Sequence, residues 1–263
     1  MPIIYVRPDS IRQAAALCAA GGRILAGGQS LIAQLNRGEI DEVTLIDINR
    51  LPELDGIAER DGWIEIGGLA RLEDVRRHPL VIERLPMLAA ALAWVANPAI
   101  RLRGTLLGNL VQFAPGAEAV AVAAAADAVL VTADTATFRL GTLPAGCLAT
   151  HVRLRPSPIG TTAAFIEVQR RAGHLGTVGC GVARQPDGCF QVAFSGLLEV
   201  PLMADHVAGA LRLGLRDLAS LSHALLSDLA GRSPRNDLHA DAKYRMAVAP
   251  VLVQRVLPKL VEA

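Results

Sequence analysis

The first 50 residues alternate between strand-like and helix-like segments, and this order constrains the fold more than any other feature of the chain. Short apolar runs typical of strands occupy residues 3–8, 23–28 and 43–51, and helical patterns over residues 9–22 and 30–40 separate them. Strands joined by helical crossovers usually lie side by side in one sheet. The order therefore predicts a small, mostly parallel or mixed sheet near the N-terminus, with Asp9 or Ser10 capping the first helix.

The character of the chain changes after residues 155–160 (RPSPIG), where two prolines and a glycine predict a domain boundary. Three strand candidates follow, and the turn signal Pro-Asp-Gly joins the second to the third as a hairpin. A helical tail completes the chain, so the C-terminal part is expected to be an antiparallel three-stranded sheet packed by helices. The strand candidates are residues 162–171, 176–185 and 189–198, and the helical candidates are residues 204–212, 215–231 and 241–261.

Composition excludes several classes of protein. Of the 263 residues, 52% are hydrophobic and 19% are charged, which argues against disorder, and the formal net charge of +1 argues against nucleic-acid binding. The N-terminus lacks the pattern of a signal peptide. The longest apolar run, residues 119–131, is too short to span a bilayer and contains Asp127. We therefore expect a soluble cytoplasmic protein.

The four cysteines show no metal-binding spacing. Cys18, Cys147, Cys180 and Cys189 form no C-x-x-C pair, and no histidine stands at zinc-finger spacing from them. They are expected to be buried apolar thiols in a reducing compartment. No metal site is expected on this chain.

Catalytic signals are weak as well. The six histidines are scattered, and no serine, histidine and aspartate stand in a G-x-S-x-G context, so no catalytic residue is predicted. Residues 216–229 form an amphipathic helical pattern that predicts Leu218, Leu221, Leu225 and Leu229 inward, with its serine, histidine and aspartate residues on a solvated face.

The segment AGGQS, residues 26–30, lies where a strand gives way to a helix. Its two glycines permit positive φ angles and close approach of a ligand to the main-chain amides, and a helix start adds unpaired donors. This combination favours a phosphate or pyrophosphate, with Ser30 as a further donor or as the helix cap. The alternative is a simple strand-to-helix turn. Neither a P-loop nor a G-x-G-x-x-G fingerprint is present.

A second glycine segment, RGTLLGN at residues 103–109, follows the apolar stretch that ends near Pro98. It is interpreted as a glycine-bearing loop that offers backbone donors and two polar side chains. Two such loops converging on one cleft would suit a long dinucleotide, although either segment alone is more often a turn. Asp47, at the end of the third strand candidate, either orients a neighbouring loop or caps a helix.

Several of these segments together resemble one family. The order YVRP, AAGGRILAGGQSLIAQL, LIDINRL, IEIGGLARLEDV, IRLRGTLLGNL and YRMAVAPVLVQRVL is similar to that in the FAD-binding medium subunit of the molybdenum hydroxylases, which include carbon monoxide and xanthine dehydrogenases. The resemblance covers nearly the whole chain. It implies an α+β fold, with an FAD-binding domain of the vanillyl-alcohol-oxidase (PCMH) type over residues 1–158 and a carbon monoxide dehydrogenase flavoprotein C-terminal domain over residues 159–263.

The resemblance also implies a function. The chain would bind FAD and relay electrons to NAD, a quinone or another acceptor. It would join a large subunit that holds molybdopterin and oxidises the substrate, and a small subunit that holds two iron–sulfur clusters, as a dimer of heterotrimers. The implied FAD contacts are Ala26, Gly27, Gly28, Gln29, Ser30, Leu31, Thr105, Leu106, Gly108, Asn109 and Leu148.

Three positions depart from the family pattern. Leu107 replaces a glycine of the usual T-I-G-G-N motif, Ala114 replaces the aspartate of H-x-D-P-A-A-[DE], and Glu167 replaces the lysine of Y-x-K-x-x-R-R. These changes imply either a modified or weak FAD site, or a structural assembly subunit of the same fold without FAD. A cell-wall-type reductase with the same FAD fold is disfavoured by the C-terminal residues 244–257.

Overall fold

A computed structural model describes residues 3–40, 43–171 and 173–260. By packing, the chain divides into two compact units that interleave in sequence. The first contains Met1–Val75, Pro98–Gln112 and Ala128–Leu154, and the second contains Arg76–Asn97, Phe113–Asp127 and Arg155–Ala263. The predicted boundary near residue 158 stays a prediction about sequence domains, since packing assigns two earlier segments to the same unit as the C-terminal sheet.

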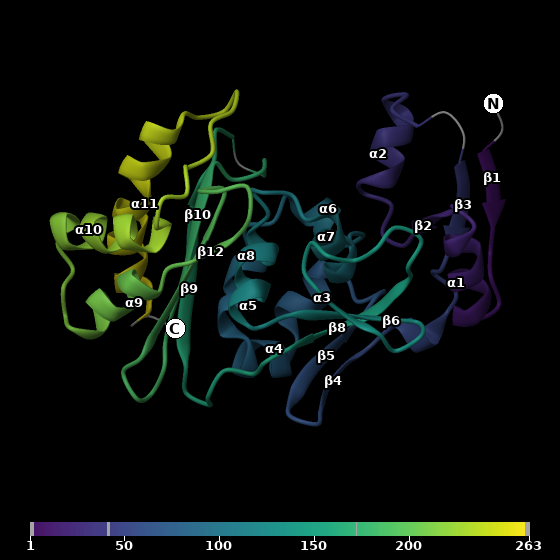
Figure 1. Ribbon diagram of the computed structural model, residues 1–263. Coiled ribbons are helices and arrows are strands. Elements are labelled where there is room, and N and C mark those ends of the chain that lie inside the picture. Colours follow the sequence, from purple (N-terminus) through teal and green to yellow (C-terminus); the bar gives the residue numbers. More distant parts are fainter. Residues whose placement is uncertain (1–2, 41–42, 172, 261–263) are drawn as a thin grey trace. The chain divides into compact units, whose positions relative to one another are not determined.

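The first unit begins with the predicted parallel sheet. Its strands are ordered β1-β3-β2 and all run parallel, with Ile3 opposite Val43 and Arg23 opposite Leu45 (Figure 1). Ser10 rather than Asp9 caps the first helix, because its hydroxyl accepts the Gln13 amide hydrogen. The elements are β1 (Ile3–Val6), α1 (Ile11–Ala19), β2 (Arg23–Leu25), α2 (Leu31–Asn36) and β3 (Val43–Asp47).

A second, antiparallel sheet completes this unit, in the order β4-β5-β8-β6-β7. Two short helices that lie near the second glycine segment belong to the unit as well. The remaining elements are η1 (Pro52–Leu54), β4 (Ile57–Arg60), β5 (Trp63–Gly67), α3 (Leu72–Arg77), α6 (Pro98–Arg101), α7 (Leu106–Gln112), β6 (Val129–Thr132), β7 (Thr137–Arg139) and β8 (Ala149–Leu154).

The second unit is built on an antiparallel sheet in the order β12-β11-β10-β9. The predicted three strands and their hairpin are confirmed, and the two-residue strand β12 adds an edge that the sequence pattern did not indicate. The elements are α4 (Pro79–Arg84), α5 (Pro86–Leu92), α8 (Glu118–Ala125), β9 (Thr162–Val168), β10 (Val178–Arg184), β11 (Phe190–Ser195), β12 (Leu202–Met203), α9 (Asp205–Arg212), α10 (Leu218–Leu229), α11 (Ala242–Val256) and η2 (Leu257–Leu260).

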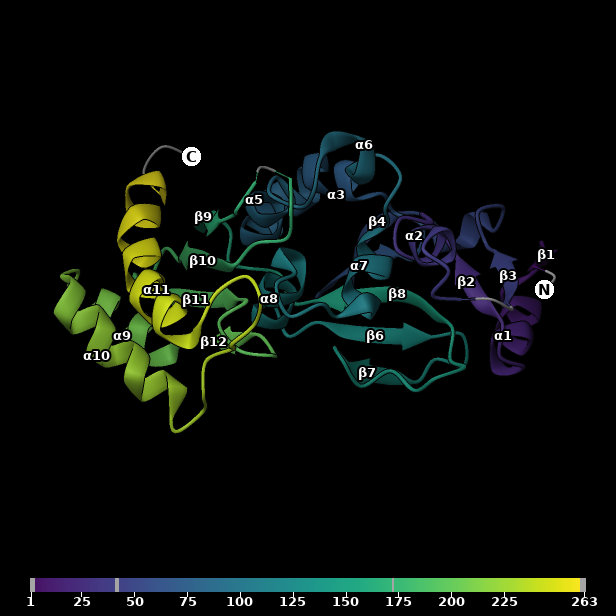
Figure 2. The same cartoon turned by 90° about the horizontal axis from the view of Figure 1, so that it is seen from above.

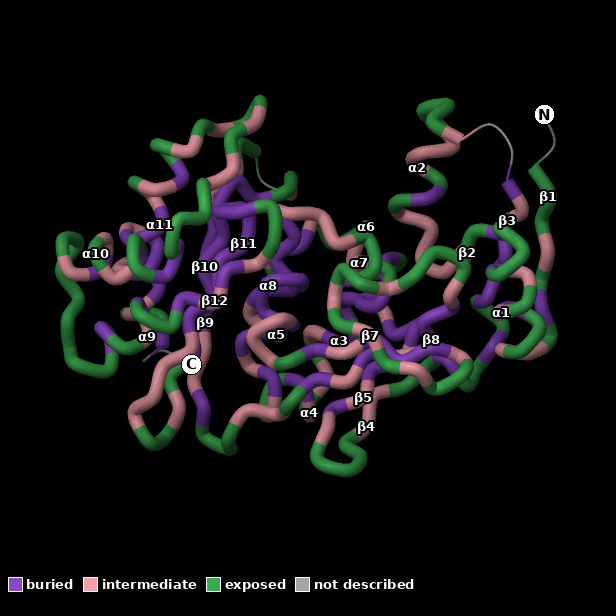
Figure 3. The backbone as a smooth tube through the Cα atoms, viewed as in Figure 1, coloured by how far each residue is buried: buried purple, intermediate pink, exposed green. Residues whose placement is uncertain are grey.

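Helices cover both faces of this sheet, which explains why β10 is almost entirely buried (Figures 2 and 3). On one face, Val182 joins an apolar cluster with Val207 of α9 and Leu252 of α11. On the other face, Gly181 leaves room for Met87 of α5 and Val122 of α8. α5 and α8 precede the sheet in sequence, so the packing unit is discontinuous although the sheet itself is a simple antiparallel one.

The C-terminal helices differ from their predicted pattern in two details. Leu218 is about half exposed, whereas Leu221, Leu225 and Leu229 are buried as predicted. Asp228 was expected on a solvated face, but it is buried and accepts hydrogen bonds from the backbone amides of His206 and Val207 at the start of α9. A buried carboxylate is tolerated there because the first amides of a helix lack partners of their own.

The described cysteines contain no disulfide, and two of them depart from the expectation. Cys18 and Cys180 are buried as expected, but Cys147 and Cys189 are partly exposed. Among the described residues, no helix is both long and apolar enough to cross a membrane.

Candidate functional site

The segment 26–30 connects β2 to α2 and depends on its glycines. Gly28 has φ +71°, a conformation that side-chain-bearing residues rarely adopt. A methyl carbon placed on Gly27 would overlap the carbonyl oxygen of Arg103 and lie 2.7 Å from the Cα of Gly104. The two glycine segments predicted from the sequence therefore pack directly against each other in the first unit.

The main-chain amides of the first segment are available to a ligand. Within the described residues, no hydrogen bond is made by the N–H groups of Gly27, Gly28, Gln29 or Ser30. Ser30 occupies the N-cap position of α2 as one alternative predicted, but its side chain makes no capping hydrogen bond. A row of unpaired amides in a positive-φ turn is a known arrangement for binding oxyanions.

The second segment is organised differently from the predicted loop. α7 already begins at Leu106, so Gly108 and Asn109 are helical, and the Gly108 amide donates to Thr105 Oγ1 at 3.1 Å. A loop was expected because glycine disfavours helix interiors, but the Thr105 hydroxyl stabilises this helix start. Most donors of the segment are thus engaged within the protein.

Asn109 is the exception in this second segment. Its Oδ1 is buried and has no hydrogen-bond partner within the described part of the chain. An unpaired buried acceptor is costly, and such groups are uncommon in folded proteins. A ligand that supplies a donor to this oxygen would remove the cost, which fits the predicted role of Asn109 in cofactor binding.

The leucines predicted to contact the cofactor have their side chains in the core. Leu31 packs with Val43 and Leu45, and Leu106 is fully buried. Leu148 belongs to the cluster that covers one face of α1. Any contact of these three residues with a ligand would therefore run through main-chain atoms.

Leu107 is also a core residue, which changes the meaning of its departure from the family pattern. It is only 4% exposed, and its Cδ2 lies 3.1 Å from the position of a methyl carbon placed on Gly68. The Leu107 side chain therefore packs inside the first unit, next to Gly68. Its side chain fills space beneath α7.

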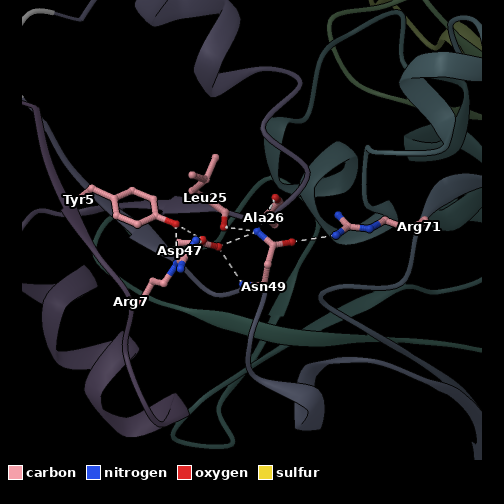
Figure 4. A network of polar contacts seen from close by, with 7 residues as sticks. All are labelled: Tyr5, Arg7, Leu25, Ala26, Asp47, Asn49 and Arg71. Carbon is pink, nitrogen blue, oxygen red and sulfur yellow. Dashed lines mark hydrogen bonds and ion pairs between the residues drawn. The ribbon is translucent and has the colours of Figure 1, made fainter.

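Asp47 orients the first glycine segment, as one of its two predicted roles required (Figure 4). Its carboxylate accepts hydrogen bonds from the Tyr5 hydroxyl, from Arg7 Nε at 3.3 Å and from the Asn49 side chain at 2.7 Å. Burial works to raise the pKa of Asp47, but these donors outweigh it and lower the pKa to about 2. The residue is therefore ionised at neutral pH. Asn49, which it holds, donates in turn to the carbonyl oxygens of Leu25 and Ala26.

Arg71 supplies positive charge near the same segment. Its guanidinium donates to the carbonyl oxygen of Arg103 and to Asn49 Oδ1, both neutral acceptors, and no carboxylate pairs with it among the described residues. Unpaired amides beside a guanidinium without a counter-charge favour an anionic ligand. Neither Asn49 nor Arg71 was predicted from the sequence. The spacing of Asp47 and Asn49 at a strand end was an available signal for an Asx-type turn, whereas nothing in the sequence marked Arg71.

Glu167 does not bring the expected negative charge. It is buried in the second unit beside Glu118, and its Oε1 accepts a hydrogen bond from Gln169. Burial, followed by the Glu118 carboxylate, raises the pKa of Glu167 to about 9, and burial raises the pKa of Glu118 to about 7. Glu167 is therefore held in its neutral form, so the glutamate at this position removes the positive charge of the family lysine without adding a negative one.

Ala114, the third departure, lies in a turn before α8. Its carbonyl oxygen accepts the amide hydrogen of Ala117 at 2.9 Å, and its methyl group adds no polar contact. No group of three or more histidine, cysteine, aspartate or glutamate residues placed to hold a metal ion occurs in the described part of the chain.

The sequence matches one family model and several known proteins. Residues 1–154 match the family model described as the FAD binding domain in molybdopterin dehydrogenase. The chain is 33% identical to the 6-hydroxypseudooxynicotine dehydrogenase complex subunit alpha of Paenarthrobacter nicotinovorans, over 97% of this chain and 93% of that protein. It is 30% identical to the carbon monoxide dehydrogenase medium chain of Hydrogenophaga pseudoflava, over 96% of this chain and 95% of that protein.

Solved structures give the same result for the fold. A chain of the carbon monoxide dehydrogenase from Hydrogenophaga pseudoflava that lacks the Mo-pyranopterin moiety superimposes with a TM-score of 0.87 at 30% identity. The match covers 100% of this chain and 98% of that chain. The predicted α+β class is thereby confirmed along the whole chain.

Proposed function

Because the chain belongs to the family of FAD-binding domains of molybdopterin dehydrogenases, we propose that it is the FAD-binding medium subunit of a molybdenum hydroxylase complex. The observation that carries the proposal is the set of unpaired amides at residues 27–30, packed against the second glycine segment at Arg103 and Gly104. Both features suit the pyrophosphate of a dinucleotide.

The predicted site residues would bind FAD through different groups. The amides of Gly27, Gly28, Gln29 and Ser30 would hold the pyrophosphate, and the exposed Ser30 hydroxyl is free to add a donor. Asn109 Oδ1 would accept a hydrogen bond from the cofactor. Leu31, Leu106 and Leu148 would contribute main-chain contacts. Ala26 would hold the first segment through the hydrogen bond that its carbonyl oxygen accepts from Asn49, and Thr105 would hold the second through the bond that its hydroxyl accepts from Gly108.

Bound FAD supplies the ability to accept and release electrons singly or in pairs, which suits a relay between iron–sulfur clusters and NAD, a quinone or another acceptor. The chain itself needs no acid, base or nucleophile for such a relay. Its residues hold the cofactor, fix its orientation and keep an electropositive environment around its phosphates through Arg71. Substrate oxidation would take place on a partner chain.

The proposed complex contains a large subunit with molybdopterin and a small subunit with iron–sulfur clusters, arranged as a dimer of heterotrimers. The names of the similar proteins support a multi-subunit assembly, since they are a medium chain and a complex subunit. A cytoplasmic location belongs to the same proposal.

Titration of the purified chain with FAD tests the proposal directly. We expect a saturable rise in melting temperature and a flavin absorption spectrum that stays with the protein, because a ligand at about 100 times its Kd stabilises the folded state by about 2.7 kcal/mol. If flavin neither co-purifies nor shifts the melting temperature, the alternative of an assembly subunit without FAD replaces this proposal.

A further inference from the structure

The side chain of Asn49 connects three parts of the first unit. Its Nδ2 donates to the carbonyl oxygens of Leu25 at 3.2 Å and Ala26 at 2.9 Å, where β2 passes into the glycine segment. Its Oδ1 accepts a hydrogen bond from Arg71 Nη2 at 2.7 Å (Figure 4). One amide group thus uses its donor side on the glycine segment and its acceptor side on Arg71.

Arg71 extends this connection to the second glycine segment. Its Nη1 donates to the carbonyl oxygen of Arg103 at 2.8 Å. Arg103 is the residue against which Gly27 packs, and the neighbouring Gly104 accepts the amide hydrogen of Leu72 through its carbonyl oxygen at 2.9 Å. Asn49 and Arg71 therefore form a bridge of two side chains between the segments, here called the Asn49–Arg71 bridge.

Asp47 determines which way the Asn49 amide points. Its Oδ1 accepts hydrogen bonds from the Asn49 main-chain amide at 3.0 Å and from Nδ2 at 2.7 Å. Nδ2 therefore faces three acceptors, the carbonyl oxygens of Leu25 and Ala26 and the Asp47 carboxylate. Among the described residues, the one donor to Oδ1 is Arg71. An aspartate at position 49 would present oxygen to those three acceptors, so the bridge requires an amide.

At its C-terminal end the glycine segment is tied to α2, because the carbonyl oxygens of Gly28 and Ser30 accept the amide hydrogens of Ile32 and Gln34. Its other main-chain groups have few restraints. Its amides from Gly27 to Ser30 are unpaired, and within the segment the only side-chain bond runs from Gln29 Nε2 to the Gly27 carbonyl oxygen among the described residues. A flexible segment binds its ligand more weakly, because ordering the segment costs free energy. A segment that is already ordered avoids that cost.

We propose that Asn49 and Arg71 are positioning residues that hold the two glycine segments at the spacing required by the FAD pyrophosphate. The proposal rests on the proposed function. Arg71 acts here through its two-armed guanidinium and not through its charge alone, because a planar fork can bond Asn49 and Arg103 together.

The test compares the FAD affinity of the FAD-free chain in four variants: Asn49→Ala, Asn49→Asp, Arg71→Met and Arg71→Lys. Quenching of flavin fluorescence measures the Kd. We expect each variant to weaken FAD binding by about tenfold or more, the size of one hydrogen bond to a charged group. Combining Asn49→Ala with Arg71→Lys is expected to add little, because both changes break the same bridge.

Matched controls separate the bridge from general effects. Asn36→Ala and Arg50→Met remove the same chemical groups at exposed positions of this unit and are expected to keep the wild-type Kd. Arg71→Lys keeps the positive charge, so a wild-type affinity in this variant would overturn the positioning role. A wild-type affinity of Asn49→Ala, within about twofold, would overturn it as well.

A second readout does not involve the cofactor. In FAD-free protein with ¹⁵N-labelled glycine, we expect the backbone order parameters of Gly27 and Gly28 to fall in Asn49→Ala and to stay unchanged in Asn36→Ala. Unchanged order in Asn49→Ala would contradict the bridge even if the Kd rises. A wild-type chain that binds no FAD would overturn both proposals, whereas wild-type binding that the variants leave intact would overturn only this one.

Discussion

Asp47 in the first unit and Glu167 in the second carry buried carboxyl groups and have nearly the same exposure, 7% and 8%, yet they differ in charge. Asp47 receives hydrogen bonds from Tyr5, Arg7 and Asn49 and remains ionised. Glu167 faces a second acid, and its Oε2 has no partner among the described residues. Burial is unfavourable to both anions; hydrogen-bond donors outweigh it at Asp47, whereas at Glu167 deeper burial and the Glu118 carboxylate both favour the neutral acid.

The difference bears on function. The ionised Asp47 is compensated locally by Arg7 and orders the glycine segment through Asn49. Glu167, which stands in place of the family lysine, has its pKa raised mainly by burial and further by the Glu118 carboxylate. At this position the positive charge of the family lysine is absent, and burial of the glutamate keeps a negative charge from taking its place.

The largest effect should come from removing the ionised partner. We expect Asp47→Ala to lower the free energy of unfolding by about 3 kcal/mol, because hydrogen bonds to a charged group are each worth about 1.5–3 kcal/mol. Urea unfolding at pH 7 measures this loss. The exposed Asp74→Ala serves as control and should change stability by less than about 0.5 kcal/mol. A loss as small as that in Asp47→Ala would contradict the account of Asp47.

Glu167→Gln should act in the opposite direction. Glutamine resembles the protonated acid and cannot ionise, so at pH 8 we expect it to raise the free energy of unfolding by at least about 1.4 kcal/mol, the equivalent of one pKa unit. Glu83→Gln, at an exposed position of the same unit, is the control. A destabilised Glu167→Gln would show that the carboxyl group is ionised and paired in the folded protein.

The pH dependence of stability should separate the two groups. The pKa of Glu167 is raised from its ordinary 4.5 to about 9, so the folded state binds the extra proton and stability falls as pH rises between these values. The pKa of Asp47 is lowered from 3.8 to about 2, so its contribution is present above pH 3.8 and is lost as pH falls through 2. Glu167→Gln should reduce the loss of stability on the alkaline side, and Asp47→Asn should reduce the loss on the acidic side. If the pH dependence of stability is the same in these variants as in the wild type, the pKa shifts assigned to Glu167 and Asp47 are contradicted.

The smallest effect on stability is expected from Ser30, in the glycine segment that Asp47 holds through Asn49. Ser30 is exposed and its hydroxyl makes no bond within the described residues, so Ser30→Ala should change the stability of the FAD-free chain by less than about 0.5 kcal/mol. FAD binding should weaken by about threefold to tenfold, the value of one hydrogen bond at a solvent-exposed position. A stability loss without a change in Kd would assign Ser30 to the fold instead of to the ligand.

Much of the fold could be predicted because it depends on local patterns. The alternation of residues 3–51 specified the parallel sheet, and the Pro-Asp-Gly turn specified the β10–β11 hairpin. The two-residue strand β12 carries too little pattern to detect. α7 was taken for a loop because Gly108 suggested one, while the Thr105 hydroxyl that supports the helix start is a contact that only the structure shows.

The order of segments by itself determined the family, the parallel N-terminal sheet and the position of the glycine segment, since these depend on spacing and backbone freedom along the chain. Only the tertiary structure decided that Gly27 packs on Arg103, that Leu107 lies in the core, that Glu167 is neutral and that Asn49 and Arg71 join the two segments. The physical reason is that ionisation, burial and bridging hydrogen bonds depend on neighbours distant in sequence, which no local pattern encodes.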